Sequence, residues 1–346
     1  MSRVLRLAGP ASALALLAAA LPLAAQAASP PYVALGDSYS SGVGTRTYIS
    51  DGTSCQRSVY AYPSLIATAR GYALNFRACS GAQVADVQNT QLTPLRATTA
   101  YVSLSVGGND AGFASVLTTC AKPSWASDCY GAIDKAQTFI KSTLPGRLST
   151  LYAAIRSKAP NAKVVVVGYP RIFNGEDCNA FTWFSPTEES RLNATADLLN
   201  STTSTAASAK GFTFANPTSR FVGHAVCDDV EWINGLSNPV SESYHPKIAG
   251  HRDGYTPVVS PLLTGSTVTA TTAVMRAAAG SADRLARQQR AYASRDASIR
   301  PESFRAPDLH SPRVLRAAAR AGVDVDDPAS VARADRTYDR LARASR

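Results

Sequence analysis

The chain has 346 residues, of which 45% are hydrophobic and 17% are charged, and its formal net charge is +10. Residues 266–346 hold 15 arginines and no lysine against 9 acidic residues, and two further arginines stand among the first six residues. The central part of the chain is therefore nearly neutral, and the overall charge gives no support to a polyanion-binding function for it. Its length suits a single domain of about 235 residues.

The first 27 residues have the pattern of an export signal. Arg3 and Arg6 form a positively charged start, Ala11–Leu23 is an apolar stretch, and residues 25–27 (Ala-Gln-Ala) form a small-residue cleavage site. The apolar stretch is shorter than the roughly 20 residues that cross a bilayer, which argues against a membrane anchor. We therefore predict cleavage before Ala28 and a secreted, extracellular protein.

Residues 28–265 alternate short β-branched runs with longer mixed segments, which is typical of βαβ units around a parallel sheet. The predicted strands are Tyr32–Leu35, Leu74–Arg77, Tyr101–Val106, Lys163–Gly168 and Phe212–Phe214. The predicted helices are Tyr62–Ala69, Ile133–Lys158 and Thr187–Ala209. The run Val164–Val167 is apolar throughout, as expected for a strand that helices cover on both faces. The pattern predicts one α/β domain.

The six cysteines all lie within this domain, and an even number in an exported chain favours disulfides. Six cysteines allow 15 pairings. We favour the pairing of sequential neighbours, namely Cys55–Cys79, Cys120–Cys129 and Cys178–Cys227. The alternative of a metal site is disfavoured, because no Cys-x-x-Cys pair occurs and the spacings do not cluster.

Residues 266–346 form an extension of a different kind, rich in alanine and arginine and poor in aromatic residues. Prolines at four positions interrupt any long helix, and the apolar residues are too few for an independent core. We expect a partly disordered extension with short helices over Ser281–Ser294 and Ala329–Ala344. A module that binds a partner or an anionic surface is the alternative. The extension lacks the interleaved aromatic residues of a single-strand binder, so no nucleic-acid partner is predicted.

Four polar stretches follow predicted strands or stand near the end of the domain. They are Gly36-Asp37-Ser38 after the first strand, Cys79–Ala82 after the second, Val106–Asp110 after the third, and Glu242–Pro246 near the domain end. The carboxyl ends of neighbouring parallel strands open on one crevice. We therefore expect these stretches to converge on a single site.

Four residues of these stretches, Ser38, Gly81, Asn109 and His245, occur in the order typical of a known family. Over residues 31–265 the chain resembles the SGNH hydrolases, also called GDSL lipases and esterases. The cysteine layout and the stretches Trp232–Gly235 and Ser241–Pro246 are similar to those of secreted actinobacterial lipases and phospholipases. The resemblance implies a three-layer α/β/α, flavodoxin-like fold around a five-stranded parallel sheet. It also implies carboxylic-ester hydrolysis without a cofactor or metal.

The chemistry of these residues agrees with the roles that the resemblance implies. A serine hydroxyl needs a base to take its proton, and histidine suits that exchange near neutral pH. Ser38 is the expected nucleophile and His245 the expected base. The negative charge of the tetrahedral intermediate needs donors that already point at it. We assign this oxyanion hole to the backbone N–H groups of Ser38 and Gly81 and the side-chain amide of Asn109.

The third member of the triad departs from the family pattern. The family commonly has an aspartate three residues before the histidine, where this chain has Glu242. In the secreted subgroup a backbone carbonyl orients the histidine instead, and here Ser243 would supply it. We favour a Ser38–His245 dyad with the Ser243 carbonyl as partner and Glu242 facing solvent. Glu242 as the triad acid is the alternative.

Other residues near these stretches receive minor roles. Asp37 and Asp110 are interpreted as acceptors that fix the loops, and the remaining histidines as structural or exposed. The candidate linings of an acyl site are Tyr39, Phe113, Trp183, Phe184 and Trp232.

Together these features predict a secreted serine ester hydrolase that acts through an acyl-enzyme. The expected substrates are lipids, phospholipids or simple acyl esters, and we expect a monomer that makes transient contact with lipid surfaces. One alternative is an esterase on acylated polysaccharide or a plant polymer. Another is a non-catalytic surface-binding protein in which the basic extension is the working part.

Overall fold

A five-stranded parallel sheet forms the centre of the structure. The structure is a computed structural model, and it describes residue 5, residues 28–301 and residues 303–345. The strands lie in the order β2-β1-β3-β4-β5. Their bounds are β1 Pro31–Gly36, β2 Ala73–Phe76, β3 Tyr101–Ser105, β4 Lys163–Val167 and β5 Thr213–Ala215. The predicted α/β fold with five parallel strands is confirmed. The predicted leader lies outside the described residues, except for residue 5.

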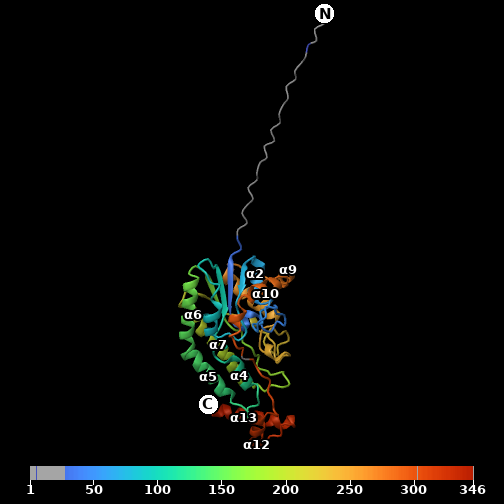
Figure 1. The fold of residues 1–346 in the computed structure, drawn as a ribbon. Coiled ribbons are helices and arrows are strands. Elements are labelled where there is room, and N and C mark those ends of the chain that lie inside the picture. Colours follow the sequence, from blue (N-terminus) through green and yellow to red (C-terminus); the bar gives the residue numbers. More distant parts are fainter. Residues whose placement is uncertain (1–4, 6–27, 302, 346) are drawn as a thin grey trace.

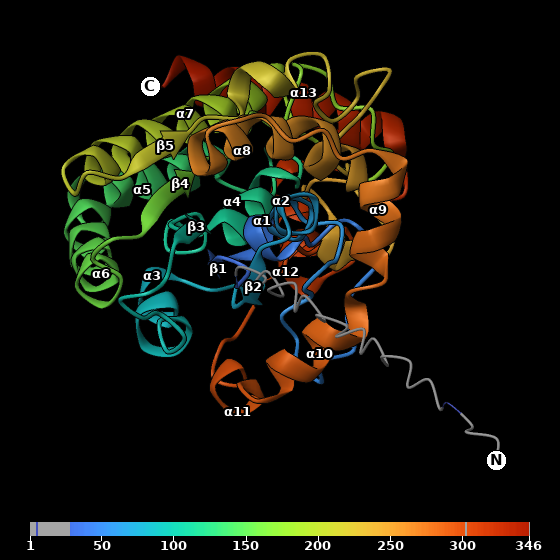
Figure 2. The same ribbon diagram turned by 90° about the horizontal axis from the view of Figure 1, so that it is seen from above.

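Helices cover both faces of the sheet (Figures 1 and 2). Helices α2 and α8 pack together on one face, and α6 and α7 pack together on the other. The helical segments of residues 28–265 are α1 Ser38–Ser41, α2 Tyr62–Arg70, α3 Val84–Asp86, η1 Val87–Gln91, α4 Phe113–Cys120, α5 Cys129–Ser142, α6 Leu144–Lys158, α7 Pro186–Ser208, η2 Thr218–Phe221, η3 Val240–Glu242, η4 Gly250–Tyr255 and α8 Thr256–Thr264. In the described part of the chain, no helix is long and apolar enough to cross a membrane.

The strand order places the site residues together. The first strand, β1, lies between β2 and β3, and the chain changes its direction of winding there. Tyr32 pairs with both Leu74 and Tyr101, and Gly36 lies level with Ser105. The loops that follow these three strands therefore leave the same edge of the sheet, next to one another, where open α/β sheets form their binding crevice.

One predicted helical stretch is divided in the structure. The segment predicted as a single helix, Ile133–Lys158, belongs to two helices, α5 and α6, which meet at Thr143. Pro145 stands in the first turn of α6 and has no backbone N–H for a hydrogen bond to the preceding turn. The chain therefore restarts a helix there instead of continuing the first one.

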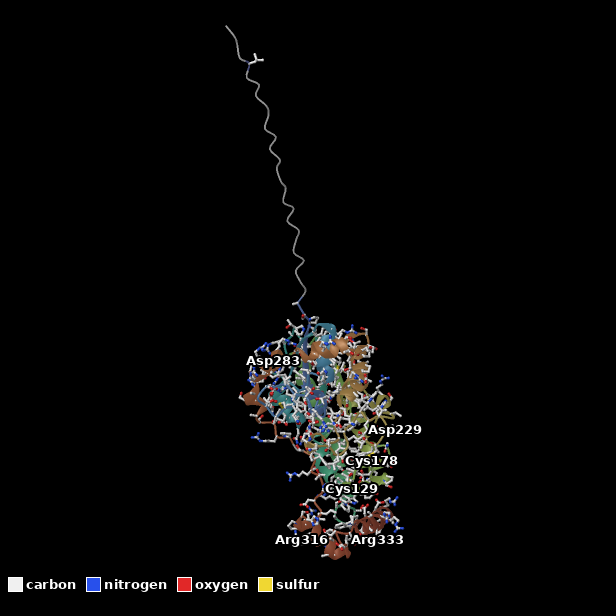
Figure 3. The ribbon with its side chains drawn as sticks, turned by 90° about the vertical axis from the view of Figure 1, so that its right-hand side faces the viewer. Cys129, Cys178, Asp229, Asp283, Arg316 and Arg333 are labelled. Carbon is white, nitrogen blue, oxygen red and sulfur yellow. A yellow bond between two sulfur atoms is a disulfide. The ribbon has the colours of Figure 1, made fainter. Side chains whose placement is uncertain are left out.

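The extension is more ordered against the domain than its composition suggests. Its helices are α9 Thr272–Ala279, α10 Ala282–Arg290, α11 Ala293–Asp296, α12 Pro312–Ala321 and α13 Pro328–Ala344. Helix α9 packs on α2, and α10 packs beside β2, the edge strand. Helices α12 and α13 lie beyond the carboxyl end of the sheet (Figure 1), and Arg316 and Arg333 project there (Figure 3).

This packing has a simple physical reason. The few apolar side chains of the extension gather on single faces of short helices and bury against the domain instead of against one another. Leu285 of α10 joins the main core, and Val314 and Val331 pack in a small cluster with Trp125 of the domain. The composition of the extension gives the number of its apolar residues, but it does not show that the domain offers a surface on which they can be buried.

The structure joins the three cysteine pairs favoured above. The bonds Cys55–Cys79, Cys120–Cys129 and Cys178–Cys227 have S–S distances of 1.99, 2.03 and 2.07 Å. The first of them ties the loop after β2 to the segment before α2.

Candidate active site

The first strand leads directly into a tight turn that carries Ser38. Gly36, at the end of β1, has a φ of +117°, and a Cβ atom there would lie 2.3 Å from the Ser105 carbonyl oxygen. The close approach and the positive φ both require glycine. Asp37 then caps the short helix α1 by accepting a hydrogen bond from the Tyr39 N–H at 3.1 Å. Ser38 begins α1 and is 6% exposed.

Asp37 fixes this turn to the rest of the sheet. Its carboxylate accepts hydrogen bonds from the hydroxyls of Ser105, at 2.6 Å, and Tyr169. Burial raises the pKa of Asp37 to about 6, against the lowering effect of these donors. The predicted role of Asp37 as an acceptor that fixes the loop is confirmed.

His245 reaches Ser38 from a loop near the end of the domain. Its Nε2 atom lies 2.9 Å from Ser38 Oγ, and its Nδ1 atom lies 2.9 Å from the carbonyl oxygen of Ser243. A carbonyl oxygen can only accept, so Nδ1 carries the hydrogen and Nε2 is left to accept from the serine hydroxyl. Burial lowers the pKa of His245 to about 4, and the Ser243 carbonyl opposes this only in part.

Tyr244 shapes the loop that holds the histidine. Its φ of +62° lies in the left-handed region, which bulky residues rarely adopt, so surrounding contacts must hold it. Its side chain is fully buried, and its carbonyl accepts a hydrogen bond from the Tyr39 hydroxyl at 2.7 Å. This bond connects the histidine loop to the helix that carries Ser38.

Gly81 and Asn109 lie in the loops after β2 and β3, the two strands on either side of the strand that leads to Ser38. Gly81 has a φ of +79°, and the preceding Cys79 is bound to Cys55. Asn109 Nδ2 donates to the Ala82 carbonyl at 3.0 Å, which occupies one of its two amide hydrogens. Among the described residues, no acceptor pairs with the Gly81 N–H. The two loops are thus tied together, and Asn109 borders the same pocket as Ser38.

The prediction that Glu242 faces solvent is wrong. Its side chain is 2% exposed, and Oε1 accepts a hydrogen bond from the Tyr48 hydroxyl at 2.7 Å. The guanidinium of Arg46 lies 3.6 Å from Oε2. Tyr48 and Arg46 come from the loop after α1, far away in sequence. The hydrogen bond from Tyr48 and the positive charge of Arg46 offset part of the cost of burying the carboxylate. Glu242 therefore ties the histidine loop to the loop after α1, while the Ser243 carbonyl contacts the ring of His245.

An apolar pocket opens beside Ser38 on the side of β3 and β4. It is a narrow cleft that is partly open to solvent. Ser38 and Asn109 stand at it, and its apolar lining includes Phe113, Leu117, Ile140, Ile172, Phe173 and Leu192. Of the five predicted linings, Tyr39 and Phe113 border this pocket, whereas Trp183, Phe184 and Trp232 do not.

Sequence reasoning missed most of this lining. Leu117 and Ile140 belong to the apolar faces of α4 and α5, and such spacing predicts a buried helix face without saying whether it meets core or pocket. Phe184 instead packs against Phe173 and Tyr244. Trp232 stacks on His224 with ring centroids 3.6 Å apart.

Asp110 and the histidines other than His245 do not contact Ser38 or His245 through any hydrogen bond between described residues. Asp110 accepts hydrogen bonds from the Val84 N–H, at 2.9 Å, and from Arg147, so it fixes its loop as predicted. His251 is fully buried and accepts from the Tyr62 N–H at 3.4 Å, and His310 is exposed.

Comparison with known proteins gives a consistent result. The chain matches the GDSL-like Lipase/Acylhydrolase family model over residues 34–252. It is 46% identical over 254 residues to Lipase 1 of Streptomyces coelicolor, covering 72% of this chain and 93% of that lipase. It is 45% identical over 268 residues to a lipase of Streptomyces rimosus, covering 75% of this chain and 98% of that lipase.

Two solved structures are similar to the fold described above. They are an extracellular lipase from Streptomyces rimosus and a phospholipase A1 from Streptomyces albidoflavus NA297. Each aligns with a TM-score of 0.63 and 42% identity, over 69% of this chain and 100% of its own.

Proposed function

The chain belongs to the GDSL-like lipase and acylhydrolase family, and from that premise we propose that it hydrolyses carboxylic esters through an acyl-enzyme on Ser38, with His245 as its base. That it is a carboxylic ester hydrolase follows from its relatives; the residues and the steps are our proposal. The observation that carries the proposal is the contact of 2.9 Å between His245 Nε2 and Ser38 Oγ.

In the first step, Ser38 Oγ attacks the ester carbonyl carbon and its proton passes to His245 Nε2. The carbonyl π bond opens, and the carbonyl oxygen becomes an oxyanion. The Ser243 carbonyl holds the Nδ1 hydrogen throughout, so the ring keeps the tautomer that accepts at Nε2.

The oxyanion would be held by donors from three loops. These are the backbone N–H groups of Ser38 and Gly81 and the free amide hydrogen of Asn109. Losing one such donor typically costs about 2.7–4 kcal/mol in the transition state. The bonds that tie these loops together support their arrangement before the substrate arrives.

Collapse of the intermediate breaks the bond between the carbonyl carbon and the alcohol oxygen. His245 Nε2 returns its proton to that oxygen, and the alcohol leaves. Water then gives its proton to His245 and attacks the acyl-enzyme, and the second collapse releases the acid and restores the Ser38 hydroxyl.

The substrate is proposed to be an ester with an apolar acyl chain, as in a lipid or phospholipid. The pocket beside Ser38 is lined by aliphatic and aromatic side chains over most of its surface, which suits a hydrocarbon chain. An acetyl group on a polysaccharide would leave most of that surface without a partner. The names of the relatives, lipase and phospholipase A1, support this substrate class.

Secretion is part of the same proposal. The predicted leader and the three disulfides fit a protein that folds outside the cytoplasm. A carboxylesterase that acts outside the cell needs no partner beyond its substrate.

Pre-steady-state hydrolysis of a nitrophenyl ester tests the proposal. Ser38→Ala should lower kcat by on the order of 10⁴-fold or more, because no acyl-enzyme can form. The wild type should release a burst of nitrophenol equal to the enzyme concentration if deacylation is slower than acylation. A Ser38→Ala variant that is folded and retains wild-type turnover would refute the proposal.

A further inference from the structure

A segment of the extension crosses the candidate active site. Residues 299–301 and 303–305, here called the strap, lead from α11 towards α12. A Cβ atom on Gly81 would lie 2.3 Å from Pro301 Cα and 2.9 Å from Pro301 N, so the strap backbone rests directly on Gly81. Phe304 is 6% exposed and meets the ring of Tyr244 edge-on at a centroid distance of 4.9 Å. The strap thus touches the proposed oxyanion glycine and the residue that precedes His245.

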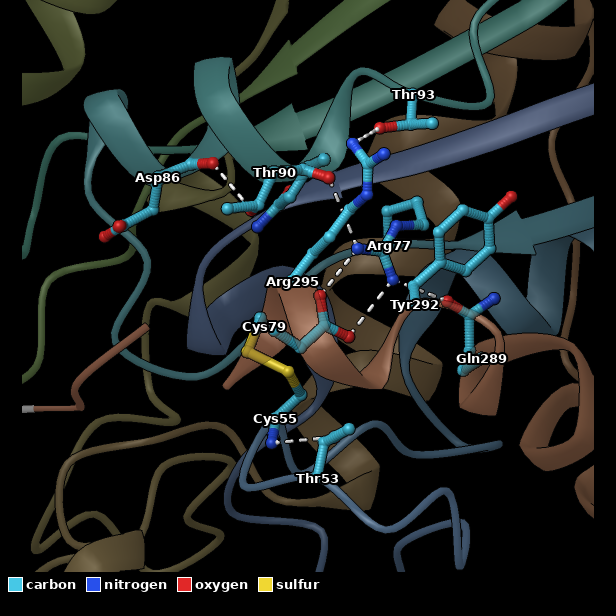
Figure 4. A network of polar contacts seen from close by, with 12 residues as sticks. Thr53, Cys55, Arg77, Cys79, Asp86, Thr90, Thr93, Gln289, Tyr292 and Arg295 are labelled. Atoms are coloured by element: carbon cyan, nitrogen blue, oxygen red, sulfur yellow. Dashed lines mark hydrogen bonds and ion pairs between the residues drawn. A yellow bond between two sulfur atoms is a disulfide. The ribbon is translucent and has the colours of Figure 1, made fainter. Parts of the chain in front are cut away.

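A buried ion pair anchors the strap at its start. Both oxygens of Asp296, at the end of α11, are engaged: Oδ2 lies 2.6 Å from Arg57 Nη2, and Oδ1 lies 2.6 Å from Arg77 Nη2. None of the three side chains is exposed. Figure 4 shows Arg77 in this network, with Gln289 and Tyr292 of the extension beside it. Ile299, three residues further on, is 1% exposed.

A second set of contacts anchors the strap at its far end. The Arg305 N–H donates to Thr118 Oγ1 of α4 at 3.0 Å. Beyond it, Asp335 of α13 accepts from the Ser124 N–H at 2.7 Å, and Asp339 accepts from the Tyr130 hydroxyl at 3.0 Å. The strap is therefore held on both sides of the site and is not a free tail.

The start of the strap, at Pro301 on Gly81, and the apolar pocket lie on different sides of Ser38. Gly81 follows β2, Ser38 follows β1, and Asn109 follows β3, in the spatial order of the strands. The pocket extends from Ser38 towards β3 and β4, and no residue of 299–301 or 303–305 lines it. An acyl chain can therefore fill the pocket without displacing the strap.

We propose that the strap forms a wall of the leaving-group side of the site, and that it slows, without excluding, the hydrolysis of esters of bulky alcohols relative to esters of small ones. This inference rests on the proposed function. With the acyl chain in the pocket, the alcohol must point away from it while its oxygen stays within reach of His245 Nε2. Pro301 lies against Gly81, on the side of Ser38 away from the pocket. Phe304 holds the strap in place through its contact with the buried ring of Tyr244. The match to the family model ends at residue 252, so the strap is an element outside it.

A panel of octanoyl esters tests the wall in the full-length protein. Ethyl octanoate, 2-naphthyl octanoate and dispersed dioctanoyl phosphatidylcholine share one acyl group but differ in the size of the alcohol. The kcat/KM value covers binding and acylation, and the acyl group is the same in all three esters. A change in the ratio of the kcat/KM values between wild type and variant therefore reports the leaving-group side.

Phe304→Ala and the double variant Pro301→Gly, Phe304→Ala should raise kcat/KM for the two bulky esters relative to the ethyl ester by on the order of tenfold. The dependence on acyl chain length should stay as in the wild type. Thr118→Val removes the acceptor of the Arg305 N–H outside the pocket, and should shift the ratio in the same direction by less. Phe181→Ala, at a phenylalanine that is 66% exposed, is the matched control and should leave the ratio unchanged.

Two outcomes would contradict the proposal that the strap limits the alcohol. Equal changes on all three esters would mean that the strap only stabilises or gates the site, and an unchanged ratio in folded variants would mean that it does not border the alcohol. The proposed function fails separately: a wild type that hydrolyses none of the esters would refute it, whereas an active wild type with unchanged ratios refutes the wall alone.

Discussion

At the scale of single residues, the partner of His245 decides the character of the site. A carboxylate beside the ring would stabilise the imidazolium by its charge, but the Ser243 carbonyl supplies only a dipole. The buried ring therefore favours its neutral form, and its pKa falls to about 4. The arrangement keeps the base ready to accept a proton over a wide pH range.

The pH dependence of kcat/KM should show this low pKa. Catalysis needs the neutral imidazole, so activity is lost as the pH falls through the pKa of His245. The acidic limb should lie near pH 4 instead of near the ordinary value of 6.5. Phe113→Ala removes a ring that packs edge-on against His245 at 5.9 Å and admits water, so it should move the limb upward. A wild-type limb at 6.5 would contradict the effect of burial.

Glu242 can be separated from a triad acid by two substitutions. Glu242→Gln keeps an oxygen for the Tyr48 hydroxyl and should leave kcat/KM nearly unchanged. Glu242→Ala leaves that half-buried hydroxyl without its acceptor and should lower the free energy of unfolding by about 1 kcal/mol, as measured by urea denaturation. A triad acid would behave differently, because its amide variant should lose on the order of 10⁴-fold in kcat.

The sequence predicted the meeting of Ser38 and His245, but not what surrounds them. Ser38, Gly81 and Asn109 were proposed because each follows a predicted strand and because they stand in the order typical of the family that the chain resembles. The burial of Glu242 could not, since it depends on Tyr48 in a loop 194 residues away. The pocket lining was missed for the same reason: a helix face looks alike whether it meets core or a cavity.

At the scale of elements, the strands and helices of the domain follow from local pattern, and the packing of the extension does not. The short helices near α10 and α13 could be predicted from composition and proline positions. The docking of the first of them, beside α11, depends on Asp296, whose partners, Arg57 and Arg77, lie more than 200 residues earlier. The sequence of a short amphipathic helix does not show which surface the helix packs against.

The buried ion pair should make α11 essential for stability. Asp296→Asn leaves Arg77 buried without a carboxylate, while Arg57 keeps its contact with Asp51. Removing one partner of a buried pair typically costs about 3–5 kcal/mol, and urea unfolding should show a loss of that size. Asp283→Asn, at an exposed position of α10, is the control and should stay within about 1 kcal/mol. A loss equally small in Asp296→Asn would contradict the anchoring role.

At the scale of the whole molecule, the extension runs along the domain from the edge strand β2 to beyond the carboxyl end of the sheet (Figure 1). Helix α10 packs beside β2, and residues of α12 and α13 form a cluster with Trp125. The boundary proposed from composition, at residue 265, marks a change of sequence character. In the structure, the polar and apolar contacts continue across it.

The central claim is that Ser38 is the nucleophile of an ester hydrolase and that His245 activates it. Its most direct test is the intact mass of the disulfide-bonded protein after exposure to an alkyl phosphonate that reacts with activated serines. We predict one adduct per chain, located on Ser38 by peptide mapping, and none in folded Ser38→Ala or His245→Ala. An adduct on another residue, or an unmodified Ser38 in the folded wild type, would contradict the claim.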